Sequence, residues 1–275
     1  MKKILVPTDF SGQADYALHV ASQLAKRHRC EIYLLHMLEL PINEIDALSS
    51  HSDLPEAMFY MKLARKRFDE VLTKPFLKNI KVHEIVKFHQ AFDGIIDTCK
   101  EYKIDIIVMG SHGVSGFREM FIGSNTEKVV RTSDIPVLVI KNYHKTFKVN
   151  NFIYASDFTD ENKEPFKKAI KFAKLVDATM HLLMINTPNK FLTTDEADSR
   201  MQNFMKGVRF KNYTINIYND YTIEKGILNF AHHIDAGLIG MSTHGRKGIA
   251  HFFNGSISED LVNHAKRPVV TFKIK

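Results

Sequence analysis

A glycine- and hydroxyl-rich motif stands between an apolar run and an amphipathic segment. It reads Gly110-x-x-Gly113, then nine residues, then Gly123-Ser124-Asn125. Glycines lack a Cβ, so backbone N–H groups in such a loop can approach a ligand closely. The Ser124 end is predicted to open a helix, whose free N–H groups and dipole favour an anion. The motif therefore indicates a phosphate-binding loop, although it lacks the lysine that a Walker loop places on the outer phosphates.

The same pattern returns later in the chain at a constant offset of 132 residues. Gly113, Gly123 and Ser124 align with Gly245, Gly255 and Ser256. The segments ILVPTDFS and FIYASDFT, at 4–11 and 152–159, open the two copies. A repeat of this length fits a whole domain rather than a solenoid unit. We predict one domain over 1–142 and a second over 150–275, with the polar segment NYHKTFKVN as the linker.

The second copy departs from the motif. Ser242 replaces Gly110, and Ile257 replaces Asn125. A Cβ at position 242 would crowd a close backbone approach, and isoleucine removes a polar group. We expect the second site to bind a nucleotide weakly or not at all.

Short apolar runs alternate with amphipathic stretches in both halves. Strands are predicted near 2–7, 31–38, 80–88, 104–110, 136–141, 151–155, 179–185, 213–218, 237–241 and 268–274. Helices are predicted near 13–28, 56–73, 92–102, 124–132, 160–176, 194–206, 222–234 and 256–265. Alternation of this kind implies parallel strands joined by right-handed crossovers. The fold class is therefore α/β, with two repeated doubly wound domains that each contain five parallel strands.

The residues that end the first and fourth strands should meet, because ligands of doubly wound sheets lie at the carboxyl ends of strands. Pro7, Thr8 and Asp9 end the first strand, and Gly110 ends the fourth. His112 precedes the loop glycine, where it either touches phosphate or shapes the loop through a hydrogen bond.

A purely structural interpretation of the serines is also open. Ser124-x-x-Glu127 and Ser256-x-x-Glu259 both match the capping box of a helix start, which would explain each serine without a ligand. Ser11 is predicted to be the N-cap of the helix over 13–28.

The chain resembles a tandem universal stress protein across nearly its whole length. The resemblance is carried by the spacing within 110–125, by SHG at 111–113, by ILVPTDFS and by LLHM at 34–37. It implies an adenine-nucleotide site for ATP, ADP or AMP, with or without Mg²⁺. Carried over, Asp9 would contact the ribose or adenine, and the Met37 backbone would contact adenine. The phosphates and ribose would be held by Gly110, Gly113, Gly123, Ser124 and Asn125.

Composition narrows the class of protein. The chain has 275 residues, 44% hydrophobic and 25% charged, as in a soluble globular protein. No apolar run is long enough for a membrane span, and no signal peptide is evident, so we expect a cytoplasmic protein. The net charge of +7 is scattered, which disfavours a nucleic-acid surface. Cys30 and Cys99 form no metal-like pair, the histidine pairs lack an acidic partner, and we expect no metal site.

Three functions are compatible with this sequence. The first is a nucleotide-binding stress or regulatory protein, at most a slow ATPase, because no general base, arginine finger or Walker lysine is evident and no catalytic residue is assigned. The second is a nucleotide-independent interaction scaffold. The third is a phosphorylated receiver domain using Asp9, which the absence of an acid directly after the third strand disfavours.

The last strand of each predicted domain carries apolar residues on both faces. An edge strand of this kind leaves backbone groups unpaired. We predict an antiparallel contact between 136–141 and 268–274, which would make the chain an intramolecular pseudo-dimer. A homodimer of whole chains stays open.

Overall fold

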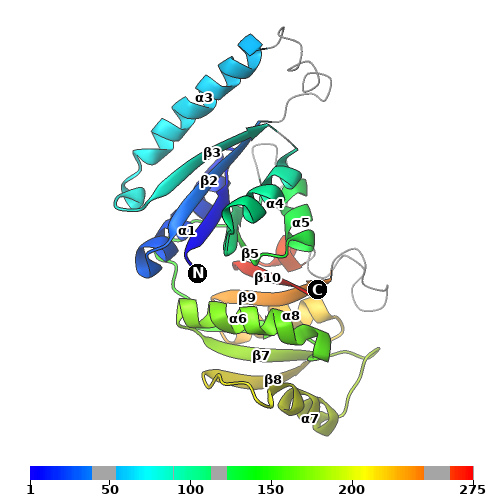
Figure 1. The fold of residues 1–275 in the computed structure, drawn as a ribbon. Coiled ribbons are helices and arrows are strands. Elements are labelled where there is room, and N and C mark those ends of the chain that lie inside the picture. Colours follow the sequence, from blue (N-terminus) through cyan, green and yellow to red (C-terminus); the bar gives the residue numbers. More distant parts are fainter. Residues whose placement is uncertain (39–53, 89, 113–122, 245–260, 275) are drawn as a thin grey trace.

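The computed structural model describes residues 1–38, 54–88, 90–112, 123–244 and 261–274. Strands and helices alternate through both halves of these residues (Figure 1). The strands are β1 Lys3–Pro7, β2 Glu31–Leu38, β3 Val82–Phe88, β4 Ile106–Gly110, β5 Val137–Ile140, β6 Asn151–Ala155, β7 Thr179–Asn186, β8 Tyr213–Asn219, β9 Leu238–His244 and β10 Val269–Ile274. The helices are α1 Gly12–His28, α3 Leu54–Leu72, α4 Ala91–Tyr102, α5 Ser124–Thr132, α6 Lys163–Val176, α7 Thr194–Met205 and α8 Ile223–His233, with 3-10 turns η2 Pro75–Leu77 and η3 Asp160–Asn162.

The described strands form one ten-stranded sheet in the order β3-β2-β1-β4-β5-β10-β9-β6-β7-β8. Within each half, all neighbouring strands are parallel. Each half therefore has the strand order of a doubly wound α/β fold, with its first strand at the centre. The predicted fold class, two five-stranded parallel arrangements flanked by helices, is confirmed.

Two apolar layers cover the faces of the sheet, and each layer runs through both halves. One layer combines α1, α3, α6 and α7 with strand residues such as Ile4 and Phe272. The other combines α4, α5 and α8 with strand residues such as Leu5 and Val269. Burial on both faces explains why the strands are nearly continuous apolar runs.

The two halves meet where β5 and β10 pair antiparallel, as the sequence predicts. Val139 pairs with Val269 and Leu138 with Val270. Successive β5 side chains belong to opposite layers: Val139 packs in the layer of α4 and Leu138 in that of α1. The Lys273 ammonium adds a contact across this junction, 3.0 Å from a carboxylate oxygen of Asp134.

The segment between β5 and β6 is fixed to α1. Gln23 donates from Nε2 to the His144 carbonyl at 3.0 Å and accepts the Phe147 N–H at 2.6 Å. Phe147 and Val149 are 2% and 1% exposed. The predicted linker is thus polar in part, but two of its apolar side chains belong to the core.

The helix predicted over 160–176 differs from the structure at its start. Residues Asp160–Asn162 form the 3-10 turn η3, and the α-helix α6 begins only at Lys163. The helix starts late because Asn162 turns its side chain inward to bond Asp157 and the sequence-distant Ser242. Much of the predicted helix over 256–265 lies outside the described residues. Its described part is helical over 261–264.

Candidate functional site

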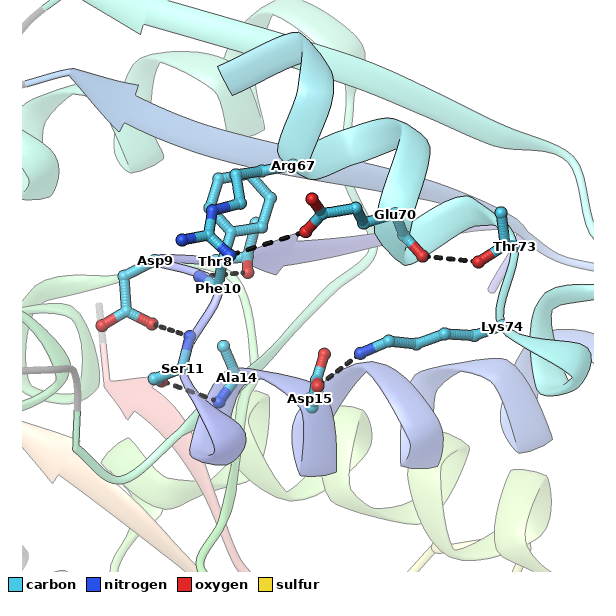
Figure 2. Close-up of polar contacts among 10 residues, drawn as sticks. All are labelled: Thr8, Asp9, Phe10, Ser11, Ala14, Asp15, Arg67, Glu70, Thr73 and Lys74. Carbon is cyan, nitrogen blue, oxygen red and sulfur yellow. Dashed lines mark hydrogen bonds and ion pairs between the residues drawn. The ribbon is translucent and has the colours of Figure 1, made fainter. Parts of the chain in front are cut away.

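A tight turn follows β1 and presents Thr8 and Asp9 at the carboxyl end of the sheet (Figure 2). The Thr8 hydroxyl oxygen accepts the Phe10 N–H, and the Asp9 carboxylate accepts the Ser11 N–H, each at 3.0 Å. Phe10 takes a φ of 62°, a left-handed conformation that a bulky side chain rarely adopts. The two side-chain hydrogen bonds hold this strained turn in place, and therefore fix the position of Asp9.

Helix α1 begins directly after the turn. Ser11 caps it, accepting the Ala14 N–H on its hydroxyl at 3.2 Å, as the sequence predicts. The first helical turn lies against the end of β4. A Cβ built on Gly110 would lie 2.9 Å from the Gln13 carbonyl carbon and oxygen. The glycine at position 110 is thus required by close packing against α1 within the protein itself.

The second part of the motif opens α5. The Gly123 N–H donates to the Ser111 carbonyl at 2.7 Å, which joins the two ends of the loop. Thr126 donates from its hydroxyl to the Gly110 carbonyl at 3.0 Å and so ties α5 to the end of β4. The first amides of an α-helix have no acceptor within the helix and carry the positive end of its dipole. The arrangement therefore directs free N–H groups toward the carboxyl ends of β1 and β4.

The capping-box interpretation of Ser124 is wrong. Helix α5 starts at Ser124 itself, its N-cap is Gly123, and no side chain accepts a capping hydrogen bond there. Glu127 lies 3.8 Å from the Arg131 guanidinium instead of bonding back to the cap. Gly123 takes the extended conformation usual for an N-cap, which leaves the Ser124 side chain exposed. Ser256 and Glu259 lie outside the described residues.

A cavity of about 310 Å³ opens between these elements. Its walls include every sequence-predicted site residue that the structure describes: Pro7, Thr8, Asp9, Met37, Gly110, His112, Gly123, Ser124 and Asn125. Gly113 lies outside the described residues. The volume is at the lower end of the range typical of small-molecule sites. Residues from four separate segments of the chain are thus brought to one concave surface.

Six further lining residues were missed from the sequence. They are Ala14, Leu35, Ala91, Ile95, Met109 and Thr126. Most are apolar, and their types alone do not distinguish a cavity wall from a core. Ala91 and Ile95 are spaced i, i+4 at the start of α4, so they face the same direction and could have been placed once the strand ends were known.

His112 follows the end of β4 and lines the cavity. Its Nδ1 shares a hydrogen bond of 2.8 Å with the Ser111 hydroxyl, in line with a loop-shaping role, while its buried Nε2 has no hydrogen-bond partner among the described residues. Burial, and secondarily the Lys141 charge, lower the pKa of His112. Burial also lowers the pKa of Lys141 to about 8. Lys141 donates from Nζ to the Asn263 carbonyl of the second half.

The corresponding end of the second half is built differently. Asp157 occupies the position of Asp9, but its carboxylate accepts from Asn162 Nδ2 at 2.8 Å. The Ser242 hydroxyl, at the position of Gly110, bonds the Asn162 amide oxygen. Asn162 is only 3% exposed. The 3-10 turn η3 makes room for the Ser242 side chain where α1 packs tightly on Gly110 in the first half.

Other chemistry-bearing residues outside this cavity have structural partners. His36 donates from Nδ1 to the Thr8 carbonyl at 2.8 Å, and His83 Nε2 lies 2.9 Å from the Glu31 carboxylate. Cys99 is 4% exposed, and burial raises the pKa of its thiol to about 12, which makes it a poor nucleophile. Among the residues the structure places, no group of three or more His, Cys, Asp and Glu side chains is arranged to hold a metal ion.

Within the described part of the chain, no helix is both long and apolar enough to cross a membrane. The protein has a Rossmann-like α/β fold, and Gly110, Gly123 and Ser124 line a cavity at the carboxyl ends of β1 and β4. The chain belongs to the universal stress protein family, whose model matches residues 1–141 and 220–273.

Relatives support this assignment over one half and over the full length. A universal stress protein of Methanocaldococcus jannaschii is 34% identical over 155 residues, spanning 51% of this chain and 94% of the relative. A universal stress protein of Synechocystis is 19% identical over 292 residues, spanning 99% of this chain and 100% of the relative. The crystal structure of a universal stress protein from Archaeoglobus fulgidus matches with a TM-score of 0.77 at 24% identity, covering 99% of this chain and 98% of that one. The last similarity shows the shared fold, and the whole-length matches agree with a tandem arrangement.

Proposed function

We propose that residues 1–142 form a domain that binds ATP or a related adenine nucleotide, and that the chain acts as a stress-response regulator in the cytoplasm. The observation that carries this proposal is the 310 Å³ cavity. It joins the turn of Asp9 to the Gly123-Ser124-Asn125 start of α5. A ligand with an apolar ring at one end and negative charge at the other matches these walls.

The cavity walls suggest how each part of the nucleotide would be held. Leu35, Met37, Ala91, Ile95 and Met109 provide an apolar lining for the adenine ring. The Met37 backbone would offer hydrogen bonds to the ring edge. Beside the apolar lining, the Asp9 carboxylate would accept hydrogen bonds from the ribose hydroxyls.

The phosphates would lie at the start of α5. The first amides of this helix and the hydroxyl of Ser124 supply donors, and the helix dipole favours the negative charge. His112 Nε2 is a further candidate for the phosphates because it is buried and no described residue is its hydrogen-bond partner. Mg²⁺ would then reach the protein with the nucleotide.

We propose that the second half binds no nucleotide. Its Asn162 side chain occupies the region between Asp157 and Ser242, which would otherwise receive ribose and phosphate. The domain over 150–275 would then act through its contact with the first, as the partner in an intramolecular pseudo-dimer. The antiparallel pairing of β5 with β10 supports this arrangement.

Hydrolysis is proposed to be slow or absent. The described cavity wall contains one carboxylate, Asp9, which already accepts the Ser11 N–H, and it contains no lysine. Phosphoryl transfer depends on positioning of the attacking water and on stabilisation of the developing charge. The described residues around this cavity offer neither a Walker lysine nor an arginine.

The alternative function is that of a nucleotide-independent scaffold, and one observation favours it. Helix α3 exposes Met58 and Phe59 at 56% and 62%, with Leu63 at 45%. Exposed apolar side chains grouped on one helix are typical of protein-binding surfaces.

Mass spectrometry of the purified chain separates the two functions. We expect the native protein to release an adenine nucleotide on denaturation, and Gly123→Asp to release none because its carboxylate would repel the phosphates. The matched control is Gly255→Asp, the same change at the equivalent motif position, which should retain the nucleotide. A chain that neither carries a nucleotide nor binds one added afterwards would support the scaffold instead.

A further inference from the structure

A second and larger cavity, of about 400 Å³, lies in the second half of the chain. It occupies the place that corresponds to the cavity of the first half. Ile223, Ile227 and Met241 line it at the positions equivalent to Ala91, Ile95 and Met109. Ala155 pairs with Leu183 as Pro7 pairs with Leu35, and both members of each pair line their cavity. The apolar part of the site is thus retained, with isoleucine in place of alanine at position 223.

The polar end of this cavity is filled by the protein itself. Asn162 donates to the Asp157 carboxylate at 2.8 Å and to the Thr159 hydroxyl at 3.0 Å, and its amide oxygen accepts from Ser242. Asp157 Oδ1, both polar atoms of the Asn162 amide and the Ser242 hydroxyl are thus engaged with one another. A ligand here would therefore place its polar group elsewhere in the cavity.

The loop after β7 also lines this cavity, and hydrogen bonds hold it in place. The Asn186 side chain bonds both backbone groups of Leu192. Its Oδ1 accepts the Leu192 N–H at 2.9 Å, and its Nδ2 donates to the Leu192 carbonyl at 3.0 Å. The Lys190 N–H donates to the Thr187 carbonyl at 3.0 Å, which closes the turn. Asn186 is 8% exposed, so these bonds are shielded from water. The loop needs little further ordering when a ligand binds, which favours affinity.

The loop after β7 and helix α7 carry the positive charge of the cavity lining. Lys190 on the loop and Arg200 on α7 both line the cavity, against a single described carboxylate, Asp157. Asp157 also acts on Lys190, since its charge partly offsets the lowering of the Lys190 pKa by burial. Among the described residues that line the cavity, cationic side chains therefore outnumber carboxylates by one, and the second cation is Arg200, which is exposed and whose charge also acts on Glu196.

We propose that this cavity binds a small amphipathic monocarboxylate, with its apolar body against Ile223, Ile227 and Met241 and its carboxylate at Lys190 and Arg200. A planar guanidinium pairs well with a carboxylate, and a single excess charge matches one anionic group better than a triphosphate. The volume fits a short aliphatic or aromatic body rather than a membrane lipid. This inference is independent of nucleotide binding by the first half.

Methyl NMR of the full chain, titrated with octanoate, tests the proposal. The methyl signals of Ile227 and Met241 should shift saturably, while those of Ile95 and Met109, their equivalents in the first half, should not. The uncharged analogue octanamide should bind about tenfold or more weakly, because it lacks the charge-assisted hydrogen bond. Saturation of the first half with ATP should leave the octanoate titration unchanged.

Two arginine variants complete the test. Arg200→Gln should lower octanoate affinity about tenfold and leave octanamide binding unaltered, whereas Arg209→Gln, an exposed residue that does not line the cavity, should change neither. Retention of the wild-type methyl spectrum shows that each variant is folded. Absence of a saturable shift, equal binding of amide and acid, or shifts confined to Ile95 and Met109 would each overturn the proposal.

Discussion

Addition of one methyl group to Gly110 measures how closely α1 packs on the candidate site. In Gly110→Ala the new Cβ would lie 2.9 Å from two backbone atoms of Gln13. Backbone atoms cannot rotate away as a side chain can, so the start of α1 must shift as a unit. Overpacking of this kind costs about 1–3 kcal/mol.

The thermal midpoint gives the readout. Each kcal/mol corresponds to a change of about 2–4 °C in a chain of this size class. The Tm of Gly110→Ala should therefore fall by roughly 2–12 °C. The shift of α1 also moves the capped turn that carries Asp9, so nucleotide affinity should fall with it.

Gly12→Ala is the matched control. Gly12 is the first residue of the same helix, and a Cβ there meets nothing within 4 Å. This substitution should leave the protein unchanged or stabilise it by about 0.4–1 kcal/mol, since alanine restricts the unfolded chain. Equal stability of the two variants, measured by calorimetry and by urea unfolding, would refute the packing argument at Gly110.

Three other predictions concern the pairing of β5 with β10, the charge of His112 and the rate of ATP hydrolysis. Val139→Pro removes a backbone donor inside the sheet and should lower the free energy of unfolding by about 1–3 kcal/mol. Hydrogen exchange of the β10 amides should become faster. Unaltered exchange of these amides would argue against the pairing of β5 with β10. The pKa of His112 is lowered in the free protein, and a bound phosphate would raise it. Nucleotide affinity should therefore increase as the pH falls through that pKa, and His112→Gln should abolish this dependence. A pH profile of affinity that is the same in both proteins would remove His112 from the site. ATP turnover should stay well below about 10 per second, and fast turnover that Asp9→Asn removes would assign a catalytic role to Asp9.

The sequence predicts most of the architecture because the strands are buried on both faces. Such strands appear as continuous apolar runs, and their alternation with amphipathic stretches permits few topologies. The pairing of β5 with β10 was also predictable, since Val139 and Leu138 leave neither face for water. The Ser11 cap followed from its hydroxyl type and its place one residue before the helix.

Details that depend on three-dimensional neighbours were not predictable in the same way. The capping box at Ser124 failed because the loop closes through the Gly123 N–H and shifts the cap by one residue. The break at Asn162 requires knowledge that Ser242, 80 residues away, bonds its amide. The two hydrogen bonds between the Asn186 side chain and the Leu192 backbone likewise depend on the conformation of the turn between them, which the residue types alone do not specify.

Isothermal titration of the full chain with ATP and Mg²⁺ tests the central proposal most directly. The proposal predicts one site per chain, lost in Gly123→Asp and retained in Gly255→Asp. Two equal sites per chain, or binding that survives Gly123→Asp, would contradict a nucleotide site built on the cavity between Asp9 and the start of α5.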